Sequence, residues 1–179
     1  MKRFLSLILV LLLSFSFLAA AAFADDSDSD ETVEYYFYDS SVFCDNMAES
    51  FAECRLDKGT MKSLCKANWD KTNDMLYIEI VDCFHEHDRL KSEIEALAPD
   101  KFAEDNLDLY NEKVQDLLTV HGEITDCYLE LYSRGLVTEK QAADSIKKLS
   151  GESGAIAAAD ALGIKLAADG SYLPPEDPQ

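Results

Sequence analysis

The first pattern along the chain is a stripe of apolar and small residues that recur alternately three and four positions apart. The stripe consists of Val33, Phe37, Ser40, Cys44, Met47, Phe51 and Cys54. Such spacing puts side chains on one face of a helix, and we predict a first helix that ends at Gly59, where glycine suits a left-handed cap. The aromatic run at residues 33–38 also has the composition of a short strand. We favour the helix, because the stripe continues unbroken past this run.

A second, wider stripe predicts a longer helix. Its members are Leu76, Ile80, Cys83, His87, Leu90, Ile94 and Leu97. Traced backwards, the stripe passes Trp69 and Cys65 to a candidate N-cap at Thr60, with a weak point at residues 72–73. Pro99 ends this helix, because the residue before a proline resists helical geometry.

Two further helices follow. The third is capped by Asp100 and ended by Gly135, and its apolar stripe is Leu107, Tyr110, Val114, Leu117, His121, Ile124, Tyr128 and Leu131. The fourth begins at Thr138 with a T-x-x-Q capping box and ends at Gly163. Inside it, the segment SGESG at residues 150–154 contains two glycines, and each costs about 1 kcal/mol relative to alanine in a helix. We therefore predict a kink or a break there.

Helices joined by short turns predict antiparallel neighbours. The predicted fold class is an all-α antiparallel helical bundle of three long helices and a weaker fourth. We assign the bundle domain to residues 32–166. An acidic leader at residues 25–31 precedes it, and a polar, proline-rich, disordered tail at residues 167–179 follows it.

The first 24 residues have the pattern of a secretory signal peptide. Lys2 and Arg3 precede an apolar stretch at residues 4–18, and Ala22 and Ala24 supply the small residues before a cleavage site. Cleavage after Ala24 leaves 179 − 24 = 155 residues, which suits one domain. We predict a secreted or extracytoplasmic protein of the cell envelope or medium. An uncleaved membrane anchor is the alternative.

The mature chain is strongly acidic. Without Lys2 and Arg3, 14 of the 16 bases remain against 35 acids, a net charge of 14 − 35 = −21. Such a surface repels nucleic acid phosphates and anionic membranes, and it suits cationic partners or simple solubility. We expect an unknown protein or cationic partner, no nucleic acid, and no membrane span after signal cleavage.

Five cysteines lie in the mature part, and outside the cytoplasm they can oxidise. Counting residues from the predicted turns puts Cys54 level with Cys65, and Cys44 level with Cys127. We predict these two pairs as disulfides and Cys83 as a buried free thiol. The second pair requires the first and third helices to pack side by side. The alternative is that all five thiols stay reduced as small core residues.

The stretch VDCFHEHDRL at residues 81–90 combines a cysteine, two histidines and several acids. Residues two apart face different sides of a helix, so His85 and His87 cannot share one ion. A zinc or copper site made of Cys83, His87 and His121 is an alternative. The repeated Glu-x-x-His pairs of metal sites in bundles are absent, so we expect no cofactor and assign His87 and His121 to the core.

Catalytic motifs are absent from the sequence. The chain has no G-x-S-x-G, Walker A, H-E-x-x-H or C-x-x-C motif, and we predict no enzyme activity and no catalytic residue. Aromatic residues at Tyr35, Tyr36 and Tyr38 are the best candidates for an interaction patch. The predicted function is a non-catalytic binding or interaction module. A metal-binding bundle and a thiol-active redox protein using Cys83 are the alternatives.

Overall fold

The computed structural model describes residues 37–98 and 104–175. In these two ranges the chain forms six helices and no strand, which confirms the prediction of an all-α bundle. The predicted signal peptide (1–24) and acidic leader (25–31) lie outside the described residues. Within those residues, none of the helices combines the length and the apolar character that a membrane span requires.

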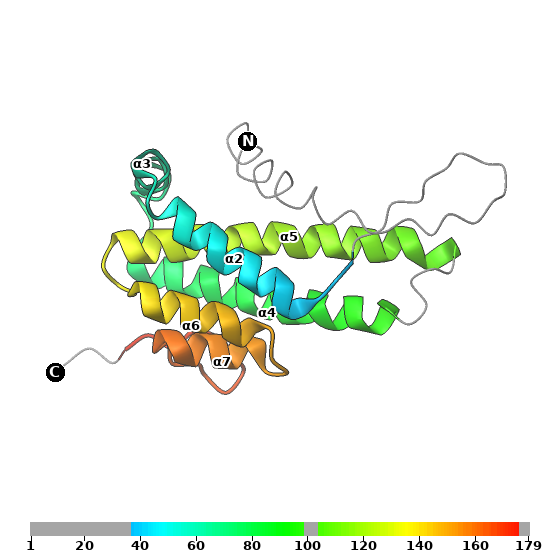
Figure 1. Ribbon diagram of the computed structural model, residues 1–179. Coiled ribbons are helices and arrows are strands. Elements are labelled where there is room, and N and C mark those ends of the chain that lie inside the picture. The colour runs from blue at the N-terminus through cyan, green and yellow to red at the C-terminus, as the bar shows by residue number, and fades with distance from the viewer. Residues whose placement is uncertain (1–36, 99–103, 176–179) are drawn as a thin grey trace.

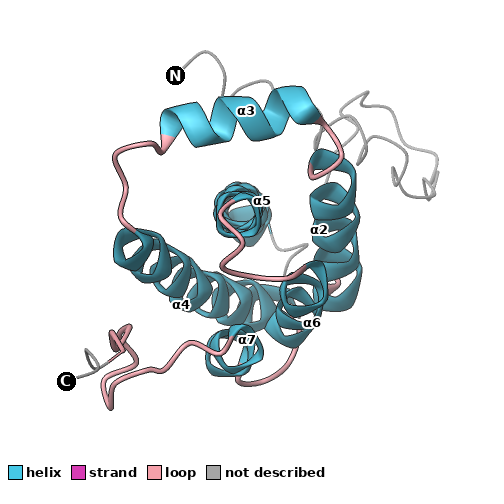
Figure 2. Cartoon of the chain, turned by 90° about the vertical axis from the view of Figure 1, so that its left-hand side faces the viewer, coloured by secondary structure: helices cyan, strands magenta, loops and turns pink. Residues whose placement is uncertain are grey.

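The body of the bundle is a pair of long antiparallel helices with shorter helices packed around them. In chain order the helices are α2 (Ser40–Cys54), α3 (Lys58–Ala67), α4 (Asn73–Leu97), α5 (Glu104–Ser133), α6 (Glu139–Leu149) and α7 (Gly154–Leu162). Helices α4 and α5 lie side by side as long rods (Figure 1), and α2, α3 and α4 surround α5 (Figure 2). The largest fully buried side chains are Tyr110, Tyr128, Phe51, Phe84 and Met47.

Helix α2 starts and ends inside the first helix predicted from the sequence. The Asp39 carboxylate caps it by accepting a hydrogen bond from the backbone N–H of Ser41 (2.9 Å). The prediction that residues 37–39 are helical is therefore wrong, and so is the predicted end at Gly59, because α2 ends at Cys54. The apolar stripe identifies the buried face, whereas local capping groups decide where the helix begins and ends.

The single long helix predicted to begin at Thr60 is divided in two at the weak point of its apolar stripe. Helix α3 begins early, because the Asp57 carboxylate accepts a hydrogen bond from the backbone N–H of Gly59 (2.8 Å). Helix α4 has its own cap, since the Thr72 hydroxyl accepts from the backbone N–H of Met75 (3.2 Å). Two capped starts replace one continuous helix, and α3 turns away from the axis of α4 (Figure 2).

The fourth predicted helix has its capping box and breaks where the glycines occur. The Thr138 hydroxyl accepts from the Gln141 N–H (3.2 Å), and the Gln141 side chain accepts from the Thr138 N–H (3.0 Å). Helix α6 then ends at Leu149 and α7 begins at Gly154. A Cβ at Gly154 would lie 2.6 Å from Asp88 Oδ1, so a residue with a side chain does not fit there.

Two charged residues of α4 hold the joint between α6 and α7. The Lys91 ammonium donates to the carbonyl oxygens of Ser150 (2.7 Å) and Gly151 (2.6 Å) at the end of α6. One turn earlier, the Asp88 carboxylate accepts from the backbone N–H of Ala155 (2.8 Å) in the first turn of α7. The cation meets the negative end of one helix dipole, and the anion meets the positive end of the other.

The chain after α7 folds back on α4. Leu166 and Tyr172 form an isolated antiparallel bridge. Tyr172 stacks on Tyr77 with 5.4 Å between ring centroids, and its hydroxyl donates to Asp74 Oδ1 (3.0 Å). The segment predicted as a tail (167–179) includes these contacts as far as the described residues extend.

Candidate functional site

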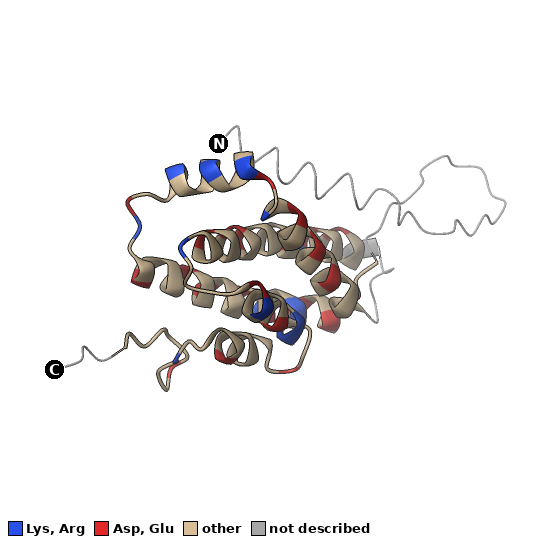
Figure 3. Cartoon of the chain, turned by 60° about the vertical axis from the view of Figure 1, so that its left-hand side comes forward, with Lys and Arg blue, Asp and Glu red and all other residues tan. Residues whose placement is uncertain are grey.

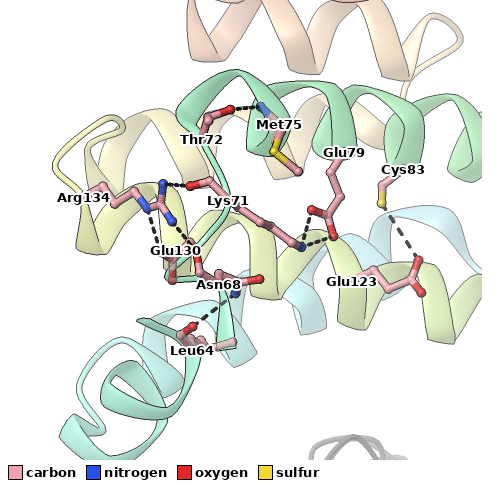
Figure 4. Close-up of polar contacts among 10 residues, drawn as sticks. All are labelled: Leu64, Asn68, Lys71, Thr72, Met75, Glu79, Cys83, Glu123, Glu130 and Arg134. Atoms are coloured by element: carbon pink, nitrogen blue, oxygen red, sulfur yellow. Dashed lines mark hydrogen bonds and ion pairs between the residues drawn. The ribbon is translucent and has the colours of Figure 1, made fainter. Parts of the chain in front are cut away.

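Polar and thiol side chains gather between α4 and α5, close to the end of α3 (Figure 4). We call this cluster the α4–α5 seam, and it consists of Lys71, Glu79, Cys83, Glu123, Asp126, Cys127, Glu130 and Arg134. Glu123, Cys127 and Glu130 recur at steps of four and three on one face of α5, Asp126 lies beside Cys127, and Arg134 directly follows the helix. On the other side of the seam, the Lys71 ammonium pairs with the Glu79 carboxylate at 2.6 Å.

Asp126 is the most perturbed carboxyl group of the seam. Burial, followed by the nearby charges of Glu123 and Glu79, raises the pKa of Asp126 to about 6. Its Oδ1 atom is buried and has no hydrogen-bond partner among the described residues. The ionised form of this side chain therefore costs free energy in the folded protein.

Arg134 fixes the joint between α3 and α4 onto the end of α5. Its guanidinium donates to the backbone carbonyl oxygens of Asn68 and Lys71, each at 2.8 Å, and pairs with Glu130 Oε1 at 2.7 Å. Glu130 is buried, so this pair lies largely out of solvent. Figure 4 shows these three contacts meeting at the Arg134 side chain. Together they fix the position of the chain between α3 and α4 relative to the end of α5.

Cys83 and Cys127 face each other across the seam. Cys83 Sγ lies 3.9 Å from Glu123 Oε2, one turn before Cys127 on α5, and the rings of Phe84 and Tyr128, which directly follow the two cysteines, have centroids 6.2 Å apart. The contact with Cys83, followed by burial, raises the pKa of the Cys127 thiol well above its usual value. Sequence reasoning gave Cys83 no partner, because α5 extends beyond the end of α4 (Figure 1) and levels counted from Pro99 are about two turns off.

All five cysteines are free thiols. Cys44 is buried on α2, and burial raises its pKa to about 12. Cys54 is half-buried at the end of α2, whereas Cys65 is exposed on α3 and its thiol donates to Ser133 Oγ (3.3 Å). The two predicted disulfides, Cys54–Cys65 and Cys44–Cys127, stay predictions.

The two histidines assigned to the core meet between α4 and α5. The rings of His87 and His121 stack with 5.1 Å between centroids and 12° between planes, and burial lowers the pKa of His121 well below its usual value. Cys83 makes its contacts elsewhere, in the seam. In the described ranges, no group of three or more His, Cys, Asp or Glu side chains is arranged to hold a metal ion. His85 is exposed, and its Nε2–H donates to the Gly170 carbonyl (2.9 Å).

Only one member of the predicted aromatic patch is described. Tyr35 and Tyr36 lie outside the described residues, and Tyr38 is half-buried. The Tyr38 backbone N–H donates to the Tyr110 hydroxyl (3.1 Å), and its ring packs edge-on against Phe43 at 5.2 Å. Tyr38 therefore contributes to the packing of the bundle near the start of α2.

A basic and apolar surface on α3 was missed by sequence reasoning. We call it the α3 face, and it consists of Leu56, Lys58, Lys62, Lys66 and Trp69. The lysines recur every four residues, so they lie on one side of the helix, and Figure 3 shows the basic residues of α3 away from the rest of the bundle. Trp69 is 81% exposed and Leu56 is 71% exposed. The lysine spacing was a visible signal, but Trp69 had been assigned to a buried stripe.

Helix α3 is held to the bundle by few contacts. It has no fully buried residue, and Met61 and Leu64 pack against the core only in part. Arg134 anchors the chain directly after α3, as described above. The α3 face is therefore carried by a helix whose outer side takes no part in the core.

The fold and these two regions define an all-α bundle with an acidic, thiol-containing seam and one basic helix face. Comparisons of the chain with protein-family models, with curated proteins and with solved structures found no match. The function is therefore inferred from the two regions themselves.

Proposed function

We propose that this chain is an exported, non-catalytic binding protein of the cell envelope or medium, and that its α3 face binds an acidic surface of another protein. The α3 face itself is the observation that supports this proposal, because it combines three lysines with two exposed apolar side chains. Export rests on the signal peptide predicted at residues 1–24.

The lysines of the α3 face are available to a partner. Among the described residues, none of the three forms an ion pair within the protein, unlike most other bases. The bases that do form ion pairs there are Arg55, Lys71, Arg89, Lys113, Arg134 and Lys140. Cations without an internal partner attract the carboxylates of another molecule over a Debye length, about 8 Å at physiological ionic strength.

The acidity of the rest of the chain narrows the kind of partner. A membrane or a nucleic acid is an extended anionic surface, and it would repel a mature chain of net charge −21 while attracting only α3. A protein with a local acidic patch avoids most of this repulsion, because screening confines each attraction to its immediate surroundings. The cationic partner expected from net charge would in turn be repelled by the α3 face.

Trp69 and Leu56 add apolar surface at the two ends of the lysine stripe. Tryptophan is enriched among the residues that dominate binding energy in protein interfaces. Its ring also buries a large area when a partner covers it, roughly 150–250 Å². An exposed tryptophan at the end of a row of unpaired lysines gives the α3 face both an apolar contact and charged contacts for a partner.

The thiol-active alternative has less support. A reactive cysteine needs a stabilised thiolate, whereas burial raises the pKa of Cys44 to about 12 and helps to raise that of Cys127. The carboxylate of Glu79 also disfavours a thiolate at Cys127. These surroundings favour protonated, unreactive thiols in the folded protein.

The proposal is tested by capture from the medium and envelope fraction of the producing cells. The protein is immobilised, and captured proteins are quantified by mass spectrometry for the native chain and for the variant Lys58→Gln, Lys62→Gln, Lys66→Gln. Glutamine removes the charge but keeps a long side chain that is compatible with a helix. We expect the native chain to capture an acidic protein, and the variant to lose it. High salt should also release this protein, because it screens the ion pairs.

A matched control separates the α3 face from net charge. The variant Lys147→Gln, Lys148→Gln, Lys165→Gln also removes three positive charges, but from exposed positions on α6 and after α7. It should capture the partner as the native chain does. Equal loss in both variants, or equal retention in both, would show that the α3 face is not the binding surface.

A further inference from the structure

The contact between Cys83 and Cys127 goes beyond the proposed binding function. The two cysteines lie opposite each other on α4 and α5, because the residues that directly follow them, Phe84 and Tyr128, have ring centroids 6.2 Å apart. The position of Cys83 is supported independently by its 3.9 Å contact with Glu123, which precedes Cys127 by one turn on the same face of α5. Both cysteines are buried, so they meet in a fixed, packed environment.

We propose that Cys83 and Cys127 form a disulfide bond in the mature protein, in place of the predicted Cys44–Cys127 pair. Cys83 lies opposite the turn of α5 that carries Cys127, as its contact with Glu123 and the contact between Phe84 and Tyr128 show. The charges that act on the Cys44 thiol are those of Lys91 and Asp45, and Cys127 is not among them. A disulfide needs an S–S distance near 2.05 Å, and cysteines that face each other on two packed helices can reach it by rotations about their Cα–Cβ bonds.

The bond forms by thiol–disulfide exchange with an external disulfide, either a small molecule or a thiol oxidoreductase. One cysteine loses its proton and attacks the external disulfide, which gives a mixed disulfide and releases one thiol. The second cysteine loses its proton and attacks the mixed disulfide, which releases the other thiol. The pair gives up two protons and two electrons, and the external disulfide is reduced to two thiols.

Burial dictates when this exchange takes place. In the folded chain an oxidant has little access to either sulfur, and the surrounding carboxylates disfavour the thiolate that must attack. The bond is therefore made while the chain folds, before α4 and α5 close over the two cysteines. The oxidising surroundings depend on the proposed export, whereas the pairing depends only on which sulfurs meet.

Peptide mapping tests the pairing directly. Protein purified from its producing cells is reduced, unfolded and refolded with a mixture of reduced and oxidised glutathione. Remaining thiols are blocked with N-ethylmaleimide, and the protein is digested with trypsin without reduction. Cleavage after Lys71, Arg89, Lys113 and Arg134 puts Cys83 in the peptide 72–89 and Cys127 in the peptide 114–134.

We expect these two peptides to be joined and two hydrogens lighter than their sum. They should remain joined in the variant Cys44→Ala and should not be joined in the variant Cys83→Ala. Peptide 114–134 joined instead to the peptide that ends at Arg55, which carries Cys44, would overturn the proposal. So would two separate, blocked peptides from refolded native protein.

The rate of oxidation tests the timing. Reduced protein that is already folded should be oxidised by glutathione disulfide at least about tenfold more slowly than protein that is refolding, since burial blocks the attacking sulfur. Equal rates would overturn the inference that the bond precedes burial. This measurement needs no variant, so it does not depend on a substituted chain folding.

Discussion

Helix α3 and the α4–α5 seam lie next to each other and have opposite chemistry. The outer side of α3 carries lysines without internal ion pairs and an exposed tryptophan. The seam carries carboxylates and thiols, most of them wholly or partly buried, and one arginine joins it to the end of α3. The net charge of the full chain, −19, hides this division. Changes in the seam should act on the stability of the fold, whereas changes on the α3 face should act on binding.

The largest expected effect comes from reducing the proposed Cys83–Cys127 bond. It closes a loop of about 45 residues, and the chain-entropy model gives a stabilisation of about 4 kcal/mol for such a loop. Urea unfolding of oxidised and reduced protein should therefore give clearly different midpoints. Identical midpoints would mean that the seam gains no stability from a cross-link.

Removing Arg134 should be the next most damaging change. The variant Arg134→Met leaves the buried Glu130 carboxylate without its cation and takes a donor from two backbone carbonyls, a loss of about 3 kcal/mol. Hydrogen exchange of the α3 amides should also speed up, because the anchor of that helix is gone. The control is Arg89→Met, since Arg89 pairs with Glu86 and Glu93 on the surface of α4, where little loss of stability is expected. Equal losses would contradict the distinction between the seam and the surface.

Asp126→Asn should stabilise the protein at neutral pH. The folded pKa of Asp126, about 6, lies above its unfolded value, so the folded state holds the proton more tightly between about pH 4 and 6. Its favourable contribution is present below pH 4 and is lost as the pH rises through 6. The asparagine side chain does not ionise, so the variant does not lose this contribution. Relative to the native protein, we expect its free energy of unfolding to be about 2 kcal/mol higher at pH 7 and unchanged at pH 4.

The control for this prediction is Asp116→Asn, at an exposed position of the same helix. The prediction is checked by thermal unfolding of both variants at pH 7 and at pH 4. A gain that does not depend on pH would assign the effect to packing rather than to the charge of Asp126. The lowered pKa of His121 makes stability fall as the pH drops below about 6.5, but this applies equally to native protein and both variants.

The smallest effect on stability is expected on the α3 face. Trp69→Ala and the triple lysine-to-glutamine variant should change the free energy of unfolding by no more than about 0.5 kcal/mol, because these side chains are exposed. Both should nevertheless weaken capture of the acidic partner. A large loss of stability in either variant would mean that the α3 face is part of the core and is not a separate binding surface.

The buried faces of the helices could be predicted from the sequence, because apolar spacing reports them directly. Leu76, Ile80, Leu90 and Ile94 are all buried as their stripe requires. The division into α3 and α4 could not be predicted with the same accuracy. It depends on Asp57, Thr72 and the distant Arg134, whose hydrogen bonds involve the backbone and leave no periodic pattern.

The antiparallel packing of the two long helices could be predicted, whereas the residues that meet between them could not. Counting from the turns requires both helices to end level, whereas α5 extends past α4 (Figure 1). This offset puts Cys83 opposite the turn of α5 that carries Cys127, whereas His121 lies opposite His87. The exposure of Trp69 escaped prediction for a related reason, since the break before α4 removes that residue from the helical stripe.

Lys91 and Asp88 of α4 bind the end of α6 and the start of α7, and these two contacts fix the orientation of the C-terminal hairpin. If α6 and α7 exchanged places, Lys91 would face backbone N–H groups and Asp88 would face carbonyl oxygens, so both contacts would become repulsive. An apolar surface alone tolerates either arrangement, because hydrophobic burial has no direction. One charged turn of α4 thus sets the direction in which the hairpin of α6 and α7 packs, although that hairpin lies some sixty residues further along the chain.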